Sequence, residues 1–523
     1  MTRLTDIEYL QLNKWHKFTY KLATFFLAIG PWFLSTGKAI GRFFKRCGIA
    51  IKDEVLDIIF TFVKGDWKTK VSYVVWGFGN AMRGQYLRAA LFFIFEVLFI
   101  LYMVFFGGMW FRKMFWPGTI GEVAVQEAWV EDPTGVIGMI KTKIYTDDSV
   151  QILLMGLLTF VFIFAAIATW RMNVKQNKIL EEILASGKKI KSNKEDLRSL
   201  VDDQFHKTLL ALPVLGIFFF TVVPTLFMIL VAFTNYDFNH DGRENFFSWV
   251  GWDNFNALFT WGGGSSGSNM GATFGQILLW TLIWAFFATF TNYFLGMIVA
   301  MMINKKGIKL KKLWRGILVL SSAVPQFISL LYISNLFSDT GIVNGMIMAM
   351  GGERVRFWTD VEKSYIARIL VIVINIWIGI PYLMLITSGV LMNIPADLYE
   401  SAKIDGANAW QSLVKITVPY MFFVTGPYLL TSFTGNLNNF NVIYLLSGGG
   451  PNNPKLAYSS NGTSGVAGDT DLLITWLFKM AIGTSNDYKT ASVIGIMIFI
   501  VVAFLSLVIY NLLPSNKNEE DFS

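Results

Sequence analysis

The sequence has few charged residues and almost none of the residues that form disulfides or bind metals. Only 15% of its 523 residues are charged, against about 25% in a typical soluble domain, while 54% are hydrophobic. The single cysteine, Cys47, excludes an internal disulfide, and the three histidines, His16, His206 and His240, are too scattered for a recognisable metal motif. This composition indicates a membrane protein and gives no sign of a metal centre.

The sequence also lacks the motifs of common enzyme chemistry. It contains no Walker pattern, no nucleophile elbow, no Cys/His metal cluster and no paired carboxylates. The Gly/Ser run at 262–268 is followed by no Gly-Lys-Ser/Thr and is therefore no phosphate cradle. The net charge of +8 is spread over particular loops, so it does not form the patch expected of a nucleic-acid-binding protein. We expect neither catalytic residues nor a cofactor, and no nucleic acid partner.

Long hydrophobic runs predict an all-α polytopic protein with eight full membrane spans, because about 20 apolar residues cross a bilayer. The predicted spans are 87–110, 150–170, 209–233, 274–303, 317–337, 366–391, 416–437 and 491–513. The run 22–34 is shorter and is predicted to lie at the membrane interface. Because Pro31 interrupts this run and no convincing cleavage site follows, we expect no cleaved signal peptide.

One basic turn orients these spans. Residues 304–315 carry five lysines and one arginine, which places this turn in the cytoplasm. Alternation then puts both termini, the polar linker 171–207 and the loop 394–415 inside. The same alternation puts the loops 235–272, 338–365 and 447–487 outside, and the acid-leaning loop 111–149 also fits the outside.

The spans divide the chain into five predicted regions. These are an N-terminal amphipathic or interfacial region at 1–86, a two-span helical extension at 87–171, a cytoplasmic linker at 172–207, a six-helix core at 208–513 and a cytoplasmic tail at 514–523. From 37 to 62 apolar residues recur at helical spacing beside several cations, which is typical of a helix on the cytoplasmic membrane surface. An amphipathic helix packed on the protein fits equally well. Glu96, inside the first span, either pairs with a neighbouring polar group or has a functional role.

A polar stretch, 394–420, interrupts two long apolar runs in the core. Pro395 at a first helical turn, followed by Asp397 and Glu400, is typical of a helix N-terminus. Gly406 can adopt the positive φ that a sharp helix stop requires. We therefore expect a short helix, a turn and a second helix, protruding from the membrane between two spans.

The spacing within this stretch resembles the coupling loop of ABC importer permeases, whose pattern is Glu-Ala-Ala, three residues, Gly, nine residues, Ile-x-Leu-Pro. The matching residues are Glu400-Ser401-Ala402, Gly406, Ile416 and Pro419, with Ser401 and Val418 as departures. The resemblance implies a type I permease core with a segment that docks in a cleft of an ATPase subunit. The docking residues it implies are Glu400, Ser401, Ala402, Asp405 and Gly406.

Four stretches, 247–255, 375–384, 438–451 and 467–480, resemble maltose/maltodextrin permeases of the MalF type, a likeness that covers 208–513. The large external domain of some MalF proteins is absent, and 65–110 looks like the N-terminal extension of some maltodextrin permeases. The resemblance implies a non-enzymatic, multi-pass permease in a bacterial cytoplasmic membrane that imports neutral oligosaccharides, above all maltose and maltodextrins. Its implied partners are a second, MalG-type permease, two ATPase subunits that use ATP and Mg²⁺, and an extracytoplasmic sugar-binding protein or lipoprotein.

Two polar stripes are the candidate substrate site. Helical spacing places Asn375, Gly379 and Tyr382 on one face of a span, and Ser432, Asn436 and Asn439 on one face of the next. Uncharged amides, hydroxyls and an aromatic ring suit a neutral polyhydroxylated solute, although the same residues also join packed membrane helices. The resemblance implies that the six positions line a sugar site. Gly435 stands where the maltose permease has a phenylalanine, which leaves the sugar and its length open.

Other functions remain as alternatives. The chain could be an ABC permease for another sugar, of the multiple-sugar or raffinose type. An ion-coupled secondary transporter would need intramembrane carboxylates or broken-helix pairs in both halves, and apart from Glu96 the spans lack such charges. A membrane-embedded enzyme would need a catalytic constellation, and none is visible.

Overall fold

The computed structural model describes residues 16, 41–42, 44–117, 126–131, 139–144, 148–243, 245–259, 270–305, 307–320, 323–460, 463–483 and 486–512. The predicted interfacial run 22–34, the Gly/Ser run 262–268 and the tail 514–523 lie outside the described residues. The chain forms two compact units. Unit 1 comprises Met1–Met109 and Leu158–Gly216, and unit 2 comprises Trp110–Leu157 and Ile217–Ser523.

Unit 1 is helical where it is described. Its elements are a helix over 44–64, α3 (Trp67–Val71), α4 (Phe78–Ala81), α5 (Tyr86–Tyr102), the π-helix η1 (Met103–Gly107), most of α7 (Ser149–Ala185), α8 (Asn193–Val201) and α9 (Phe205–Ile217). α5 packs on α7 through aromatic rings, with Tyr102 edge-on to Phe162 at 4.9 Å between centroids. The Tyr102 hydroxyl also lies 2.8 Å from Thr159 Oγ1. α8 begins at Ser192, whose hydroxyl and Glu195 form a capping box.

Glu96, the acid inside the first span, is buried in unit 1 with 9% of its surface exposed. Its Oε2 accepts a hydrogen bond of 2.8 Å from the Trp76 backbone N–H. The carboxylate therefore satisfies a backbone donor in the segment before α5. Of the two alternatives for this residue, pairing with a polar group is the one that the structure shows.

The helix over 44–64 packs on α7 through one face only. Arg171 Nε lies 2.7 Å from Glu54 Oε1, and Lys178 Nζ lies 2.5 Å from Asp57 Oδ1. The Tyr73 hydroxyl donates a hydrogen bond of 2.7 Å to the Ile58 carbonyl. Large apolar residues on the rest of the helix are exposed. Packing on the protein thus accounts for one face of this amphipathic helix, while large apolar side chains on its other sides remain exposed.

Unit 2 contains the remaining elements. The helices are α6 (Gly108–Met114, which begins in unit 1), the π-helix η2 (Phe218–Val222), α10 (Val223–Val231), α11 (Asp253–Phe259), α12 (Met270–Asn304), α13 (Lys311–Leu320), α14 (Gln326–Leu336), α15 (Ile342–Ala349), α16 (Ser364–Met392), α17 (Ala396–Ile404), α18 (Ala409–Ser412), the π-helix η4 (Leu413–Thr417), α19 (Val418–Leu437), α20 (Phe440–Ser447), α21 (Leu473–Ile482) and α22 (Tyr488–Leu512). Two antiparallel hairpins join β1 (Gln126–Glu131) to β2 (Met139–Ile144) and β3 (Asn452–Ser460) to β4 (Thr463–Gly468).

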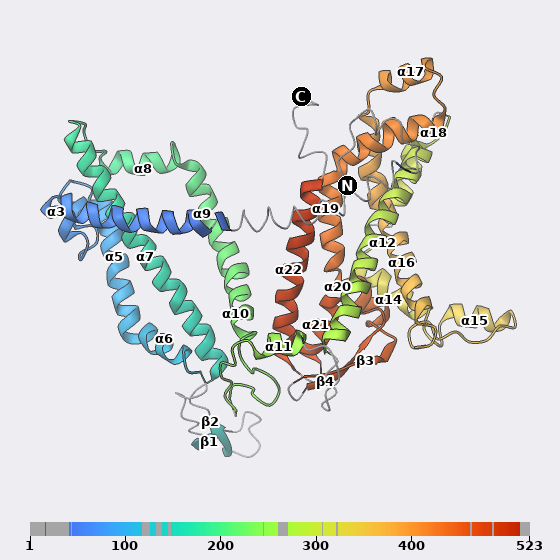
Figure 1. Cartoon of the computed structure of the whole chain (residues 1–523), viewed down its shortest axis with the longest axis horizontal. Helices are drawn as coiled ribbons and strands as arrows, with labels where there is room; N and C mark the ends of the chain where they lie inside the picture. Colours follow the sequence, from blue (N-terminus) through green and yellow to red (C-terminus); the bar gives the residue numbers. More distant parts are fainter. Residues whose placement is uncertain are drawn as a thin grey trace. The chain divides into compact units, whose positions relative to one another are not determined.

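α12 is the central helix of unit 2, since it packs against both α16 and α19. Trp284 of α12 is fully buried in a cluster with Val371 of α16 and Val442 of α20. Within this unit, Figure 1 shows α17 and α18 at one end of the long helices and α11, β3 and β4 at the other. The long helices therefore separate two ends with different surface elements.

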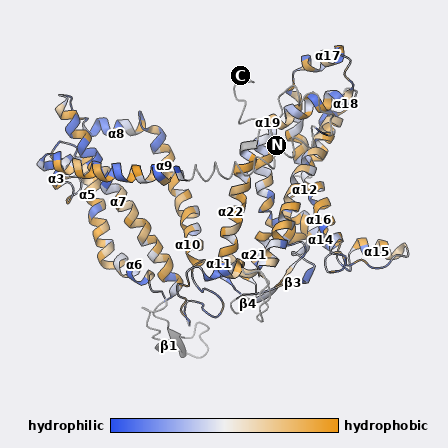
Figure 2. Ribbon diagram, in the orientation of Figure 1, coloured by the Kyte–Doolittle hydropathy of each residue, from blue (hydrophilic) through white to orange (hydrophobic). Residues whose placement is uncertain are grey.

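In the described part of the chain, seven helices are long and apolar enough to cross a membrane. They are Tyr86–Met114, Ser149–Ala185, Phe205–Val231, Met270–Asn304, Ser364–Met392, Ala409–Leu437 and Tyr488–Tyr510. Figure 2 shows hydrophobic residues in orange along these helices and hydrophilic residues in blue at α8 and near α18. Each of the seven matches a predicted span.

The eighth predicted span, 317–337, is not one continuous helix. α13 ends at Leu320, and α14 begins at Gln326 with Pro325 as its N-cap. Proline has no N–H to donate to the preceding turn, and its ring disfavours helical backbone at the residue before it. The apolar run is therefore split into two short helices, although its hydropathy resembles that of a single span.

Candidate functional site

The α16 stripe divides into a packed part and an exposed part. Asn375 is 7% exposed, and its carbonyl accepts a 3.4 Å hydrogen bond from Asn292 Nδ2 of α12. A Cβ atom placed on Gly379 would lie 2.7 Å from the same Nδ2 atom, so the absence of a side chain here allows α12 and α16 to approach each other. Tyr382, almost one turn further, is 57% exposed. Only the tyrosine presents a large accessible surface to a solute.

The α19 stripe shows the same division. Asn436 Nδ2 donates to Thr289 Oγ1 of α12 at 3.0 Å. Asn439 Nδ2 donates to Asn436 Oδ1 at 3.2 Å, while Asn439 Oδ1 accepts from Val442 N at 3.3 Å and so caps α20. Ser432 is half-buried. Gly435 is exposed, and no atom lies within 4 Å of the position that its Cβ would occupy.

The two stripes meet on α12, at two polar residues that the sequence analysis missed. Thr289 contacts the α19 stripe and Asn292 contacts the α16 stripe, one turn apart on the same helix. Both are buried, and Asn292 Oδ1 has no hydrogen-bond partner among the described residues. The signal in the sequence was available: two polar residues three positions apart within a long apolar run.

A second contact joins the two helices beside the exposed parts of the stripes. Tyr428 of α19 is partly buried against a hydrophobic cluster that contains Leu383 of α16, the residue after Tyr382, and it lies one turn before Ser432. The accessible groups at this position are a phenol, hydroxyls and amides, with no charged side chain among the seven candidate residues. Such groups exchange hydrogen bonds with sugar hydroxyls and stack on sugar rings, whereas an anionic solute would require Arg or Lys.

The protruding segment has the predicted helix–turn–helix form. α17 follows Pro395, which is the N-cap itself and does not lie within the first turn as predicted. Gly406 has φ +77°, which confirms the positive φ predicted for it. Its N–H donates to the Lys403 carbonyl at 3.2 Å, and the Ala407 N–H donates to the Ala402 carbonyl at 2.9 Å. These two bonds form a Schellman motif, with the glycine in its usual place.

The predicted coupling residues lie on the surface of this segment. Glu400, Ser401, Asp405 and Gly406 are exposed and Ala402 is half-buried. Two large apolar side chains near them were not among the predicted residues: Ile404 is 86% exposed and Trp410 is 70% exposed. An exposed apolar pair next to acidic residues is typical of a protein-docking surface.

α17 is fixed to the rest of unit 2 at its base. The Tyr399 hydroxyl lies 2.9 Å from Thr417 Oγ1, at the end of η4. Asn408 caps α18 through a reciprocal pair of hydrogen bonds with Gln411, each 2.8 Å long. A hydrogen bond therefore links α17 to η4, which continues directly into α19 and its polar stripe.

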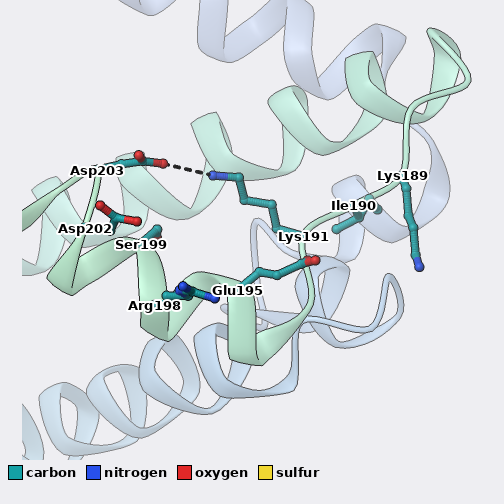
Figure 3. A pocket seen from close by; sticks show the side chains of 8 residues that line it. All are labelled: Lys189, Ile190, Lys191, Glu195, Arg198, Ser199, Asp202 and Asp203. Carbon is teal, nitrogen blue, oxygen red and sulfur yellow. Dashed lines mark ion pairs between the residues drawn. The ribbon is translucent and has the colours of Figure 1, made fainter.

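Two other pockets are poorer candidates for a substrate site. One, of about 440 Å³, lies at the break between α13 and α14 and is lined mainly by apolar residues, together with Gln326 and Ser329. The other lies against α8 in unit 1 and is lined by charges of both signs (Figure 3), two of which, Lys191 and Asp203, pair at 3.7 Å. Over the described residues, no group of three or more His, Cys, Asp or Glu could hold a metal ion.

Seven apolar helices, an uncharged polar site between α12, α16 and α19, and an exposed helical loop define a polytopic membrane permease. Residues 292–517 match the family described as "Binding-protein-dependent transport system inner membrane component", a range that contains both predicted stripes and the protruding segment. The chain belongs to this family of inner-membrane permeases, because its sequence is 32% identical to two permease proteins and aligns with 84% and 86% of their lengths.

Three relatives illustrate the similarity. The maltodextrin transport system permease protein MalC of Streptococcus pneumoniae is 32% identical over 384 residues, covering 72% of this chain and 84% of MalC. The galactooligosaccharides transport system permease protein GanP of Bacillus subtilis is 32% identical over 383 residues, covering 72% and 86%. The maltose/maltodextrin transport system permease protein MalF of Escherichia coli is 34% identical over 262 residues, covering 50% of this chain and 48% of MalF.

These comparisons confirm the resemblance to maltodextrin permeases and a multi-pass location in the membrane. All three relatives are permease proteins, in agreement with the expectation that this chain is not itself an enzyme. The identity to a maltodextrin permease and to a galactooligosaccharide permease is the same. Sequence similarity therefore does not distinguish between these two classes of sugar.

Proposed function

We propose that this chain is the transmembrane permease subunit of an ATP-driven importer of neutral oligosaccharides, with maltose and maltodextrins as its substrates. The observation that carries the proposal is the uncharged site between α16 and α19, in a chain whose relatives are named as oligosaccharide permeases. Each sugar hydroxyl bound there contributes about 0.5–1.5 kcal/mol. Several such bonds, together with stacking on Tyr382, give modest affinity, which suits a site that must also release its substrate.

The proposed substrate-binding residues are not equivalent. Tyr382, Ser432 and Gly435 contact the sugar directly, because they have accessible surface. Asn375, Gly379, Asn436 and Asn439 define the shape of the site through their contacts with α12 and α20. On this division, Tyr382→Ala lowers the apparent affinity for sugar, whereas Asn436→Ala also loosens the packing of α19 on α12.

The proposed energy source is a pair of separate ATPase subunits that dock on α17 and α18. Glu400, Ser401, Ala402, Asp405 and Gly406 provide the polar part of the docking surface. Ile404 and Trp410 provide its apolar anchors, and burying an isoleucine of this exposure is worth about 1.5–3 kcal/mol. The remaining proposed partners are a second permease and an extracytoplasmic sugar-binding protein at the α11, β3 and β4 end of unit 2. On this proposal, the chain itself needs no cofactor.

A galactooligosaccharide importer is the second candidate, favoured by the equal identity to GanP. The open space at Gly435 fits either class of sugar, because nothing within 4 Å of its Cβ position restricts ring orientation. The two candidates differ only in substrate, so the same complex tests both.

The test is sugar uptake by proteoliposomes that contain the complete complex and its binding protein. Uptake of maltodextrins of increasing length and of galactooligosaccharides is measured for the parent and for Tyr382→Ala. Tyr365→Ala, which changes an exposed tyrosine at the start of the same helix, is the matched control. We expect maltodextrin uptake that falls in Tyr382→Ala, while the control and the basal ATP hydrolysis are unchanged. Uptake of galactooligosaccharides alone would favour the second candidate, and normal uptake by Tyr382→Ala would contradict the proposed site.

A further inference from the structure

We propose that the helix over 44–64 lies in the cytoplasmic interface of the membrane, with its exposed apolar stripe among lipid chains and its cations at anionic lipid phosphates. This surface shares no residue with the proposed sugar site or with the proposed ATPase-docking surface. The proposal therefore goes beyond the transport function. It rests on four features of the helix over 44–64: its position on α7, its direction, its exposed apolar side chains and its charges.

The position of the helix follows from its ion pairs with α7. Residues 150–170 of α7 contain no charged side chain, so Arg171 marks the end of the hydrocarbon-spanning part. Glu54 and Asp57 pair with Arg171 and with Lys178, seven residues further along α7. Seven residues of helix cover about 10 Å, and the headgroup region on each side of a bilayer is about 5–8 Å thick. These ion pairs hold the helix at the level of the lipid headgroups.

The direction of the helix also fits this position. Figure 1 shows the 44–64 helix, in dark blue, running across α5 and α7 and not alongside them. Since α5 and α7 are spanning helices, a helix that crosses them at this level lies along the membrane surface. A further span would instead have to run parallel to them.

The exposed surface of the helix is largely apolar. Ile51, Val55, Ile59 and Phe62 form a stripe and are between 45% and 66% exposed, whereas the face that carries Glu54, Asp57 and Thr61 is turned toward the protein. Ile49, Leu56, Phe60 and Val63, outside the stripe, are between 38% and 63% exposed. So many exposed large apolar side chains are unfavourable in water and favourable at the boundary between headgroups and acyl chains. A water-facing helix would carry polar residues in these positions.

The charges beside the stripe indicate lipid as its partner. Lys45, Arg46 and Lys52 are exposed, and no ion pair joins them to an acid within the part of the chain that the structure describes. The acids Glu54 and Asp57 are instead engaged by α7. Lysine and arginine extend their aliphatic stems along an apolar surface and reach the phosphate level with their charged ends. The outward surface of the helix is thus apolar and cationic, which complements an anionic leaflet.

The first test measures the surroundings of the stripe in the full-length permease, with Cys47→Ser as background. A spin label is placed at Val55→Cys, on the stripe, or at Asp53→Cys, an exposed position on the other side of the helix, in vesicles of phosphatidylcholine and phosphatidylglycerol. We expect the label at Val55 to be more accessible to oxygen than to a water-soluble nickel chelate, and the label at Asp53 to show the reverse. Greater access of nickel at Val55 would show that the stripe faces water, and shielding from both probes would show that protein covers it. Either result overturns the proposal.

The second test separates the anionic headgroup from the apolar contact. An environment-sensitive fluorophore at Ile59→Cys is compared in vesicles with and without phosphatidylglycerol, in the parent and in Lys45→Gln with Lys52→Gln. We expect a larger blue shift in the parent when phosphatidylglycerol is present, and no such difference in the double variant. Lys189→Gln, an exposed lysine of the linker, is the control and should behave like the parent. A parent that does not respond to phosphatidylglycerol would overturn the cation–phosphate contact. Neither test requires sugar transport, so failure here is distinct from failure of the proposed function.

Discussion

Replacement of Gly406 by valine tests the coupling segment most sharply, because this glycine combines a positive φ with open surroundings. Its φ is +77°, and no atom lies within 4 Å of its Cβ position. A substitution therefore acts through backbone strain and not through a steric clash. A β-branched residue in this left-handed conformation costs about 1–3 kcal/mol.

The backbone strain weakens the two hydrogen bonds that terminate α17. The Gly406 and Ala407 N–H groups hold the carbonyls of Lys403 and Ala402, and both bonds depend on the left-handed turn. A cost of about 2 kcal/mol shifts the equilibrium between the formed and the opened turn about 30-fold. Opening the turn changes the position of α17, which carries Ile404, relative to α18, which carries Trp410, so the proposed docking surface loses its shape.

The assay is sugar-stimulated ATP hydrolysis by the purified complex in proteoliposomes. We expect Gly406→Val to reach the membrane normally and to lose most of the stimulation by the loaded binding protein. Gly406→Asn is the matched control, because asparagine tolerates a positive φ and should retain most of the stimulation. Charge reversal at Glu400 should resemble the valine variant. If Gly406→Val hydrolyses ATP and imports sugar like the parent, the turn does not transmit the signal and the coupling role is refuted.

Three further predictions follow from other parts of the structure. Gly435→Phe should fold normally, because its Cβ position is open, and should disfavour long or branched sugars relative to disaccharides; an unchanged length profile in uptake assays would contradict this. Asp237→Asn should destabilise the protein in thermal unfolding in detergent, because it breaks a buried ion pair with Lys489 and breaking such a pair costs about 3–5 kcal/mol, whereas Asp253→Asn on the surface should change little. The pKa of Glu54 is lowered to about 2 by its hydrogen bonds to Arg171 and then Lys175, and the pKa of Asp57 is lowered by Lys178 and Arg171. The contribution of these ion pairs to holding the helix on α7 is fully present above the ordinary Glu pKa of 4.5 and is lost as pH falls from there through about 2. A spin label at Cys47 should therefore stay immobile from neutral pH down to about 4.5. Release of the label near neutral pH would show that these pairs do not anchor the helix.

Features that depend on neighbouring residues in the sequence could be predicted. The stop at Gly406 is local, since a helix that must turn sharply favours glycine at the left-handed position, and the structure has φ +77° there. The long spans are local in the same sense, because length and hydropathy alone identify a helix that can cross a bilayer. The run 317–337 passed the same hydropathy criterion, yet Pro325 separates α13 from α14 within it. One proline hardly changes the average hydropathy of a long run, so hydropathy alone could not predict this break.

Features that depend on distant residues could not be predicted in detail. Helical spacing placed Asn375, Gly379 and Tyr382 on one face, but only the folded chain shows that Asn292, from another helix, contacts the first two. The exposure of Ile404 was equally hidden, because an apolar residue in a short helix is usually turned toward the protein. A pattern along one helix identifies its faces, but not the neighbour that covers each face.

We propose that this permease moves neutral oligosaccharides at the expense of ATP hydrolysed by partner subunits. The most direct measurement is maltotriose uptake by proteoliposomes that hold the permease pair with its ATPase subunits and loaded binding protein, with and without enclosed ATP and with and without an ionophore. We predict uptake that requires ATP, persists when the ionophore dissipates ion gradients, and is lost in Gly406→Val but not in Gly406→Asn. Uptake that proceeds without ATP or the ATPase subunits and is abolished by the ionophore would instead identify an ion-coupled transporter and contradict the proposed ATP-driven import.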